Sequence, residues 1–157
     1  MNKTLRTTAS SLLLTGLLLA VTVSTAFAAP PQSLHIEVDE YIGTSGETFF
    51  ASGPAVSSGA VCPTGTVDDL SIVASGPSGG SSTILHVLKR FHCTDLSGTF
   101  DVRMTVHLDL VTNETTASWR VAGGTGAYTH LRGNGSLVGT PIVPGTSIHD
   151  VYDGKVH

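Results

Sequence analysis

Histidine and carboxylate side chains are the first candidates for chemistry in this chain of 157 residues, which contains seven histidines. Imidazole and carboxylate groups converging on one strand face can bind a divalent cation. Two segments place such groups at alternate positions: His35, Glu37 and Asp39 in one, and Asp101, His107 and Asp109 in the other. No compact metal-ligand spacing accompanies them, so we interpret both sets as solvated faces of half-buried strands. We expect no metal and no cofactor.

Paired catalytic carboxylates also lack support. Asp68 and Asp69 are adjacent, and neighbouring residues of a strand face opposite ways. We interpret them as a surface pair or a turn. The other acidic residues are scattered, so glycoside-type acid–base chemistry cannot be assigned. The catalytic residues, if the protein is an enzyme, stay unknown.

Large aromatic and sulfur-containing side chains are the second kind of candidate. Trp119, the only tryptophan, shares a predicted strand face with Ala117 and Val121. Such side chains either fill an apolar core or line a cavity that holds a small apolar ligand. The candidate ligand-binding residues are Phe100, Met104, Trp119, Tyr128 and Tyr152.

A glycine-rich stretch separates two of the predicted strands. A phosphate-binding loop needs a Lys-Ser/Thr pair or a following helix, and neither follows these glycines. Glycine permits positive φ and close approach of backbones, as a sharply turning barrel strand requires. We therefore interpret the glycines as structural. They are Gly123, Gly124, Gly126, Gly133 and Gly135.

The elements that position these residues are strands. Apolar residues alternate with polar ones from residue 34 to 39 and, most regularly, from 100 to 109. The composition is rich in Gly, Ser, Thr and Val, and no segment has apolar residues at helical spacing. Short turn signals separate the runs. The predicted strands are 34–39, 47–52, 67–74, 83–93, 100–109, 115–122, 135–140 and 149–156.

Eight strands with short connections predict an all-β domain that is a sandwich or a closed barrel. Closure removes exposed strand edges and is therefore attractive. Residues 29–157 are enough for one domain, and we find neither an internal repeat nor a linker. No substantial helix is expected in this part of the chain.

The segment from Trp119 to Tyr128, continued by residues 131–137, resembles the signature turn of the allene oxide cyclase-like and dirigent-like β-barrels. Residues 150–156 resemble the last strand of small secreted bacterial proteins grouped with these barrels. The resemblance implies a single antiparallel eight-stranded β-barrel with a calycin-like interior. Known members include cyclases with polar groups inside the barrel and dirigent proteins that steer radical coupling. No catalytic residue of these families can be matched to a position here.

The first 28 residues have the pattern of a secretory signal peptide. Lys3 and Arg6 precede an apolar run from residue 11 to 23, and Ala26-Phe27-Ala28 provides the small residues of a cleavage site. The apolar run is shorter than the about 20 residues of a membrane-spanning helix. We predict cleavage before Ala29 and a mature protein that is secreted, either extracellular or periplasmic.

The charge of the chain and its two cysteines limit the partners and the cellular compartment that we expect. Loss of Lys3 and Arg6 leaves six basic and twelve acidic residues, a formal charge of −6. No clustered basic footprint is visible, so we expect no nucleic-acid partner and no membrane binding after cleavage. Cys62 and Cys93 match no zinc or redox spacing, and an oxidising compartment favours a disulfide between them.

Three functions remain open at this point. The first is a module that binds a small apolar or amphipathic molecule inside the barrel. The second is an enzyme of the cyclase or isomerase type that acts on a reactive substrate in the same place. The third is a solid barrel that acts as an extracellular interaction protein through its loops, such as residues 75–82. A solid interior would favour the third, and an open interior without buried ionisable groups would favour the first. Buried glutamate, histidine or arginine side chains converging in the interior would favour the second.

Overall fold

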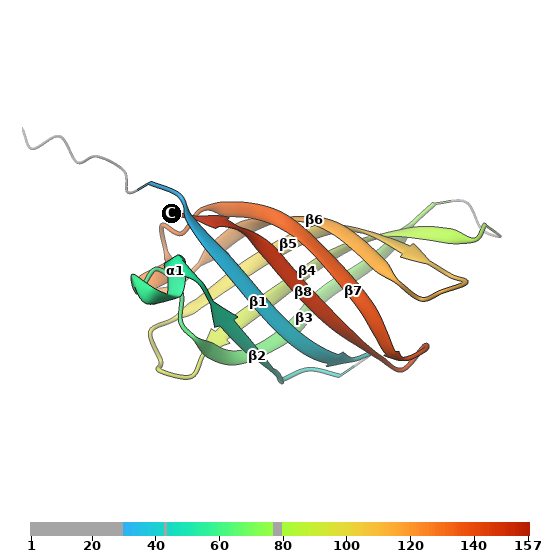
Figure 1. Cartoon of the computed structure of the whole chain (residues 1–157), viewed down its shortest axis with the longest axis horizontal. Coiled ribbons are helices and arrows are strands. Elements are labelled where there is room, and N and C mark those ends of the chain that lie inside the picture. Colours follow the sequence, from blue (N-terminus) through green and yellow to red (C-terminus); the bar gives the residue numbers. More distant parts are fainter. Residues whose placement is uncertain (1–29, 43, 77–79) are drawn as a thin grey trace, which may run out of the picture.

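The computed structural model describes residues 30–42, 44–76 and 80–157. Eight antiparallel strands close into one barrel in chain order, and β8 pairs back onto β1 (Figure 1). The strands are β1 (Gln32–Tyr41), β2 (Glu47–Ser52), β3 (Thr64–Ser75), β4 (Ser82–Cys93), β5 (Thr99–Asp109), β6 (Thr115–Gly124), β7 (Gly133–Val143) and β8 (Ser147–Val156). Within the described residues the helical elements are a short helix, α1 (Pro54–Ser57), and a 3₁₀ turn, η1 (Gly126–Tyr128). The predicted all-β class and the closed barrel are confirmed.

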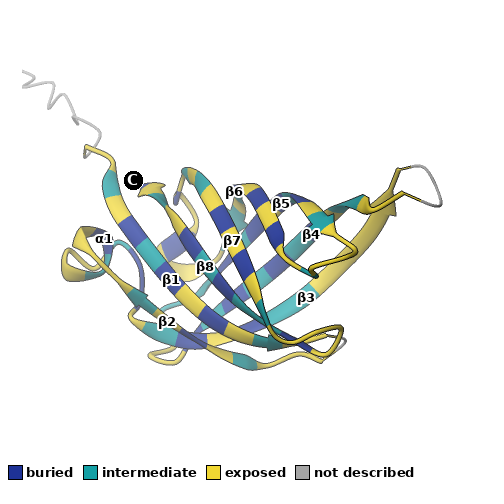
Figure 2. Cartoon of the chain, turned by 45° about the vertical axis from the view of Figure 1, so that its right-hand side comes forward, coloured by how far each residue is buried: buried dark blue, intermediate teal, exposed yellow. Residues whose placement is uncertain are grey.

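The period-two pattern of the sequence is what builds the barrel wall. In β1, Leu34, Ile36 and Val38 are buried, whereas the polar residues between them face outward. β5 shows the same alternation from Phe100 to Val106. Buried and exposed residues accordingly alternate along the strands in Figure 2. The outer part of β3 departs from this pattern, because its last six residues are exposed where the β3–β4 hairpin extends beyond the barrel.

The two ends of the barrel differ. At one end lie α1, the C terminus and the connection from β6 to β7; at the other lie the β3–β4, β5–β6 and β7–β8 hairpins (Figure 1). The disulfide between Cys62 and Cys93 joins the segment after α1 to the end of β4. The predicted disulfide is confirmed, and we call the end that contains it the closed end.

Aromatic side chains fill the barrel toward the closed end. Phe91 and Phe100 stack with their ring centroids 4.8 Å apart, and Phe49, Tyr128 and Tyr152 pack edge-on against this pair. All five are buried. Such offset and edge-to-face contacts are the preferred arrangements of aromatic rings. This half of the barrel is therefore a packed core, which we call the aromatic plug.

Trp119 is also buried in the wall of the core, and two glycines make room for it. A Cβ at Gly135 or Gly154 would collide with atoms of the indole ring. The indole N–H donates a hydrogen bond of 2.9 Å to the carbonyl oxygen of Ser136. Gly135 thus serves to seat a large side chain, which is a more specific structural role than the turn predicted from the sequence.

The glycine-rich stretch is only partly the tight turn expected from the sequence. Gly123 and Gly124 belong to the end of β6, and the chain then makes η1 before β7 begins at Gly133. Gly126 has a φ of 58°, and a side chain there would meet the backbone of Ser97. The glycines therefore allow the β6–β7 connection to pack closely across the closed end.

Several sequence predictions lie outside the described residues or stay untested. The predicted signal peptide, residues 1–28, is outside, as are residues 77–79 of the predicted 75–82 loop. No helix in the described part of the chain is long and apolar enough to cross a membrane.

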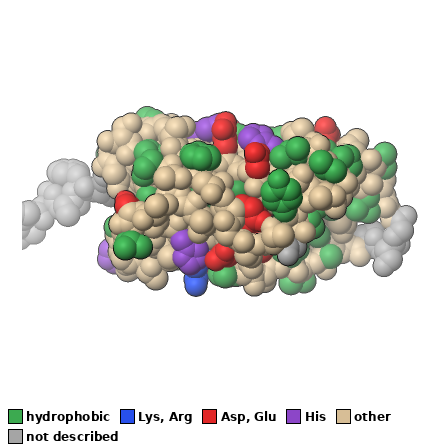
Figure 3. All heavy atoms as spheres, turned by 90° about the horizontal axis from the view of Figure 1, so that it is seen from below, with side chains coloured by type: hydrophobic (Ala, Val, Ile, Leu, Met, Phe, Trp, Pro, Cys, Tyr) green, Lys and Arg blue, Asp and Glu red, His purple; other side chains and the backbone are tan. Residues whose placement is uncertain are grey.

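On the face shown in Figure 3, histidine and acidic side chains lie close together and few basic side chains are visible.

Candidate functional site: a cavity in the open half of the barrel

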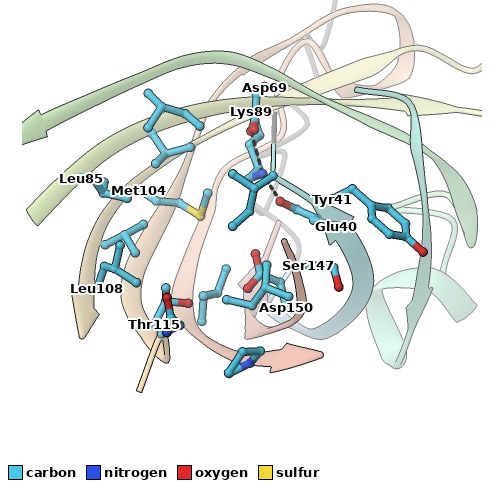
Figure 4. A pocket seen from close by; sticks show the side chains of 18 of the residues that line it. Glu40, Tyr41, Asp69, Leu85, Lys89, Met104, Leu108, Thr115, Ser147 and Asp150 are labelled. Carbon is cyan, nitrogen blue, oxygen red and sulfur yellow. Dashed lines mark hydrogen bonds and ion pairs between the residues drawn. The ribbon is translucent and has the colours of Figure 1, made fainter. Parts of the chain in front are cut away.

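The end of the barrel opposite the aromatic plug is hollow. A cavity of about 250 Å³ lies among the strands and reaches the turns at this end, including Tyr41, Ile42 and Gly145. Inward-facing aliphatic and thioether side chains form most of its wall (Figure 4). They include Ile72, Leu85, Val87, Met104, Val106 and Leu108. The interior of the barrel is therefore open on one side and apolar over most of its surface.

A buried lysine bound to two carboxylates lies at one side of this cavity. Lys89 on β4 donates a hydrogen bond to Glu40 of β1, and its Nζ lies 2.6 Å from Asp69 Oδ1 of β3. Figure 4 shows Lys89 between the two acids. The side chain of Lys89 is 7% exposed, that of Glu40 12% and that of Asp69 23%. A buried charge is tolerated only when it is paired in this way.

The strand register explains why these three side chains meet. Asp69 and Lys89 are directly opposite each other in the β3–β4 pair, and the register shifts immediately afterwards, at Leu70. Lys89 occupies an inward position between Val87 and Phe91, as strand alternation requires. Asp68, by contrast, faces outward and lies 3.0 Å from His92. The interpretation of Asp68 and Asp69 as a surface pair or turn was therefore wrong for Asp69, because closure of the sheet turns one face of β3 into an interior.

A third carboxylate, Asp150 of β8, points into the same cavity. It is 6% exposed, and its Oδ1 has no hydrogen-bond partner among the described residues. Asp150 lies opposite Gly139 of β7, which in turn lies opposite Thr115 of β6. A Cβ at Gly139 would collide with Asp150 Oδ1 and with Thr115 Oγ1. Glycine at this position makes the space that the carboxyl group of Asp150 occupies.

The electrostatics of the cavity are dominated by burial. Burial raises the pKa of Asp150 to about 7, and the negative charge of Glu40 acts in the same direction. Burial likewise raises the pKa of Glu40 although Lys89 opposes this. Burial alone would lower the pKa of Lys89, but Glu40 and Asp69 together outweigh it and raise that pKa. Lys89 is thus a permanent cation, and Asp150 changes charge near neutral pH.

Tyr152 borders this polar group from the side of the aromatic plug. Its ring packs edge-on against Phe91, and its hydroxyl has no hydrogen-bond partner within the described part of the chain. Burial raises the pKa of Tyr152 well above its ordinary value, and Glu40 and Asp150 add to the effect. The hydroxyl therefore stays protonated and close to the carboxylates.

The five ligand-contact residues predicted from the sequence are divided between cavity and core. Met104 lines the cavity. Phe100, Tyr128 and Tyr152 belong to the aromatic plug, and Trp119 lies in the core beside Gly135 and Gly154. The hydroxyl of Tyr128 lies 2.8 Å from Ser97 Oγ at the closed end. The structure thus places one of the five predicted residues in the cavity wall and the other four in the packed core.

The sequence analysis missed the charged residues of the cavity, although a signal for them exists. Positions 85, 87, 91 and 93 carry the inward apolar residues of β4, and Lys89 interrupts that series. Continuing the alternation of Leu34, Ile36 and Val38 by one step places Glu40 on the inward face. A charged residue at an inward position of a barrel strand is the signal that identifies this site.

The histidines lie outside the cavity, on the solvated faces that the sequence indicated. His35 Nδ1 is 2.7 Å from Asp153 Oδ1, and His149 Nδ1 is 2.6 Å from Asp39 Oδ1. These are pairs between β1 and β8 on the outer face. The hydrogen bond that His35 donates to Asp153 raises the pKa of His35, with a smaller contribution from the hydrogen bond to Glu37. Among the described residues no group of three potential ligands is placed to hold a metal ion.

Three basic residues form a short row on the outer surface. Arg103 and Arg120 are opposite each other in the β5–β6 pair, and Lys155 follows beyond Asn134. All are exposed. Their side-by-side placement could not be inferred from the linear sequence, but three cations are few for a nucleic-acid footprint.

Comparison with models of protein families, with curated proteins and with solved structures found no match to this chain. The resemblance to allene oxide cyclase-like barrels therefore rests on the sequence motifs alone. The cavity and its charges, rather than any relative, have to carry the functional argument.

Proposed function

We propose that the protein is an exported binding module that holds a small amphipathic molecule in the open half of its barrel. The observation that carries this proposal is an apolar-walled cavity with a buried carboxyl group, Asp150, that has an unpartnered oxygen. An apolar pocket with a few convergent polar groups is the usual form of a small-molecule site. The apolar part of the ligand contacts the aliphatic wall, and its polar end faces the carboxylates.

The size of the cavity limits the ligand. The cavity volume of about 250 Å³ has room for roughly eight non-hydrogen atoms. This number assumes about 30 Å³ for each atom, which is the volume of one molecule in liquid water. A longer ligand has to extend through the open end, past Tyr41 and Ile42, which are exposed at the mouth.

The proposed export rests on the signal-peptide pattern of residues 1–28. The disulfide between Cys62 and Cys93 supports it, because disulfides persist chiefly in oxidising compartments. The closed barrel of eight strands is the fold that the resemblance to allene oxide cyclase-like barrels implies, but a fold of this kind hosts many functions and does not assign one.

Native mass spectrometry of the protein purified from its own culture medium tests the proposal. We expect a complex whose excess mass disappears on denaturation and a denatured chain that begins at Ala29. The variant Leu108→Trp places an indole in the cavity wall and should lose the ligand. Val138→Trp is the matched control, because Val138 is exposed on the outer face of β7. An apo mass for the wild type, or a ligand retained by Leu108→Trp, would contradict binding in the barrel.

Proton transfer on a bound substrate is the second candidate function. A buried carboxyl group with a pKa of about 7 is poised to act as a general acid or base near neutral pH. Asp150 would then serve an isomerase or a cyclase. Incubating the co-purified molecule with the protein in D₂O distinguishes the two functions. Carbon-bound deuterium that appears with the wild type and not with Asp150→Asn supports catalysis, and its absence with both supports simple binding.

A further inference from the structure

We propose that the polar end of the ligand is a protonated amine that binds between Asp150 and Glu40. This inference rests on the proposed function and deepens it by naming the class of ligand. It depends on which atoms of the cavity lack a partner and on the charge balance around them.

The unpartnered oxygens of residues that line the cavity belong to carboxyl groups and can accept hydrogen bonds, whereas the unpartnered hydroxyl of Tyr152 belongs to the aromatic plug. Asp150 Oδ1 and Glu40 Oε1 are buried and accept no hydrogen bond from any described residue. Both residues line the cavity, and Figure 4 shows their carboxyl groups on the same side of it. Leaving a buried acceptor unpaired is unfavourable, and it is more so when the group is charged. A ligand group that donates several hydrogen bonds relieves this cost.

Negative charge exceeds positive charge among the groups that line the cavity. Among the described residues, Lys89 is the only basic one that lines the cavity, and its ammonium group is already bound to Glu40 and Asp69. One cation therefore faces three carboxyl groups when Asp150 is ionised. An ammonium group supplies one further positive charge and three donors, so it reduces the net charge of these groups from −2 to −1 and provides hydrogen-bond donors for both unpartnered oxygens.

Other head groups fit less well. A carboxylate would meet three carboxyl groups and a lysine whose charge is already neutralised by two of them. A hydroxyl supplies a single donor and no charge. A metal ion is not supported by the described residues, which contain no group of three ligands with suitable geometry.

Binding of an amine should be linked to the loss of a proton from Asp150. A cation beside this carboxyl group favours its ionised form, so affinity should rise as the pH increases through about 7, the pKa of Asp150 in the empty cavity. Thr115 on β6 and Gly139 on β7 adjoin Asp150, and neither of them titrates. The charged or titratable groups that influence Asp150 or adjoin it are Glu40 on β1, Asp69 on β3, Lys89 on β4, and His149 and Tyr152 on β8.

Isothermal titration calorimetry with three probes of equal chain length tests the inference: n-hexylamine, hexan-1-ol and hexanoate, each added to the full mature protein. At pH 8 we expect hexylamine to bind at least tenfold more tightly than hexanol and hexanoate to bind most weakly. The affinity for hexylamine should rise at least tenfold between pH 5 and pH 8, whereas the affinity for hexanol should change little.

Two variants separate the cavity charge from general surface charge. Asp150→Asn should weaken hexylamine at least tenfold at pH 8 and reduce the pH dependence, with little change for hexanol. Asp153→Asn removes an acid from the outer face of the same strand, where its side chain is 66% exposed, and should leave all three probes unchanged. If Asp150→Asn does not fold, as judged by near-ultraviolet circular dichroism, Glu40→Gln and the pH series on the wild type take its place.

The outcomes distinguish this inference from the proposed function. Equal affinities for hexylamine and hexanol would overturn the amine assignment and leave binding of an amphipathic molecule intact. Tightest binding of hexanoate would overturn it in favour of an anion held by Lys89. If no probe binds and native mass spectrometry finds no ligand, both the inference and the proposed function fail.

Discussion

Asp150 illustrates how one residue can connect the chemistry of the cavity to the stability of the fold. An unfolded aspartate has a pKa of about 3.9, whereas burial raises the pKa of Asp150 to about 7 in the barrel. The folded protein therefore binds a proton over a pH range in which the unfolded chain has lost it. The stability that this proton contributes is complete below the unfolded pKa and is lost as the pH rises through about 7.

We expect the wild-type protein without ligand to be less stable at pH 8 than at pH 5, and Asp150→Asn to remove much of this difference. Each pH unit between the two pKa values is worth about 1.4 kcal/mol per proton, so the change attributable to Asp150 is about 1–3 kcal/mol. Urea unfolding at the two pH values measures it. Asp153→Asn should keep the part of the pH dependence that comes from Asp150 and lose only the part that comes from His35, whose pKa Asp153 raises. An equal pH dependence in wild type and Asp150→Asn would contradict the assigned burial cost.

The charged residues of the cavity were only partly accessible from the sequence. Lys89 interrupts an otherwise apolar series in β4, and this could have been noticed. The pairing of Lys89 with Glu40 could not, because 49 residues separate them. Only the closed sheet, in which β1 and β4 face each other across the interior, brings the two side chains within hydrogen-bond distance.

Among the strands, β7 shapes the cavity through a residue without a side chain, Gly139. Gly139 lies between Asp150 and Thr115 in adjacent strands, and a Cβ there would collide with both side chains. The sequence analysis interpreted Gly133 and Gly135 as structural and passed over Gly139. Its role depends on cross-strand neighbours, which a linear pattern does not identify.

We expect Gly139→Ala to destabilise the protein by about 1–3 kcal/mol through overpacking and to weaken hexylamine binding, because the carboxyl group of Asp150 has to move. Gly123→Ala is the matched control, since a Cβ at Gly123 meets no atom within 4 Å. Chemical denaturation and calorimetry of both variants provide the measurement. Similar behaviour of the two alanine variants would show that Gly139 does not position Asp150.

The aromatic plug should supply much of the stability of the barrel. Phe91 is fully buried and contacts Phe49, Phe100 and Tyr152, whereas Phe50 on β2 is 64% exposed. We expect Phe91→Ala to cost about 3–5 kcal/mol, as is typical of buried phenylalanines, and Phe50→Ala to cost less than about 1 kcal/mol. Urea unfolding tests the contrast, and comparable losses in both variants would show that the plug is not the stabilising core.

For the molecule as a whole, the disulfide and the cavity lie at opposite ends of the barrel. The disulfide between Cys62 and Cys93 closes a loop with a sequence separation of 31 at the closed end. The cavity lies in the other half and is lined by neither cysteine. The disulfide and the proposed binding site are thus separated in space.

The double variant Cys62→Ala/Cys93→Ala should lose about 3–4 kcal/mol of unfolding free energy, the chain-entropy value for a loop of this length. Binding of hexylamine, measured where the variant is fully folded, should stay within about threefold of wild type. Thiol titration of the wild type should find no free thiol before reduction. A tenfold loss of affinity in the folded double variant would show that the closed end shapes the cavity.

The sequence by itself determined the approximate positions of the strands, the disulfide partners and the apolar faces of β1 and β5, because period-two alternation and the composition are local properties. It also determined that His35 of β1 lies on a solvated face. Only the tertiary structure decided that the barrel is packed at one end and hollow at the other. It also decided that Glu40, Asp69, Lys89 and Asp150 share that hollow. The reason is physical: these residues come from four strands, and a shift of one residue in any register would turn a side chain from the interior to the solvent.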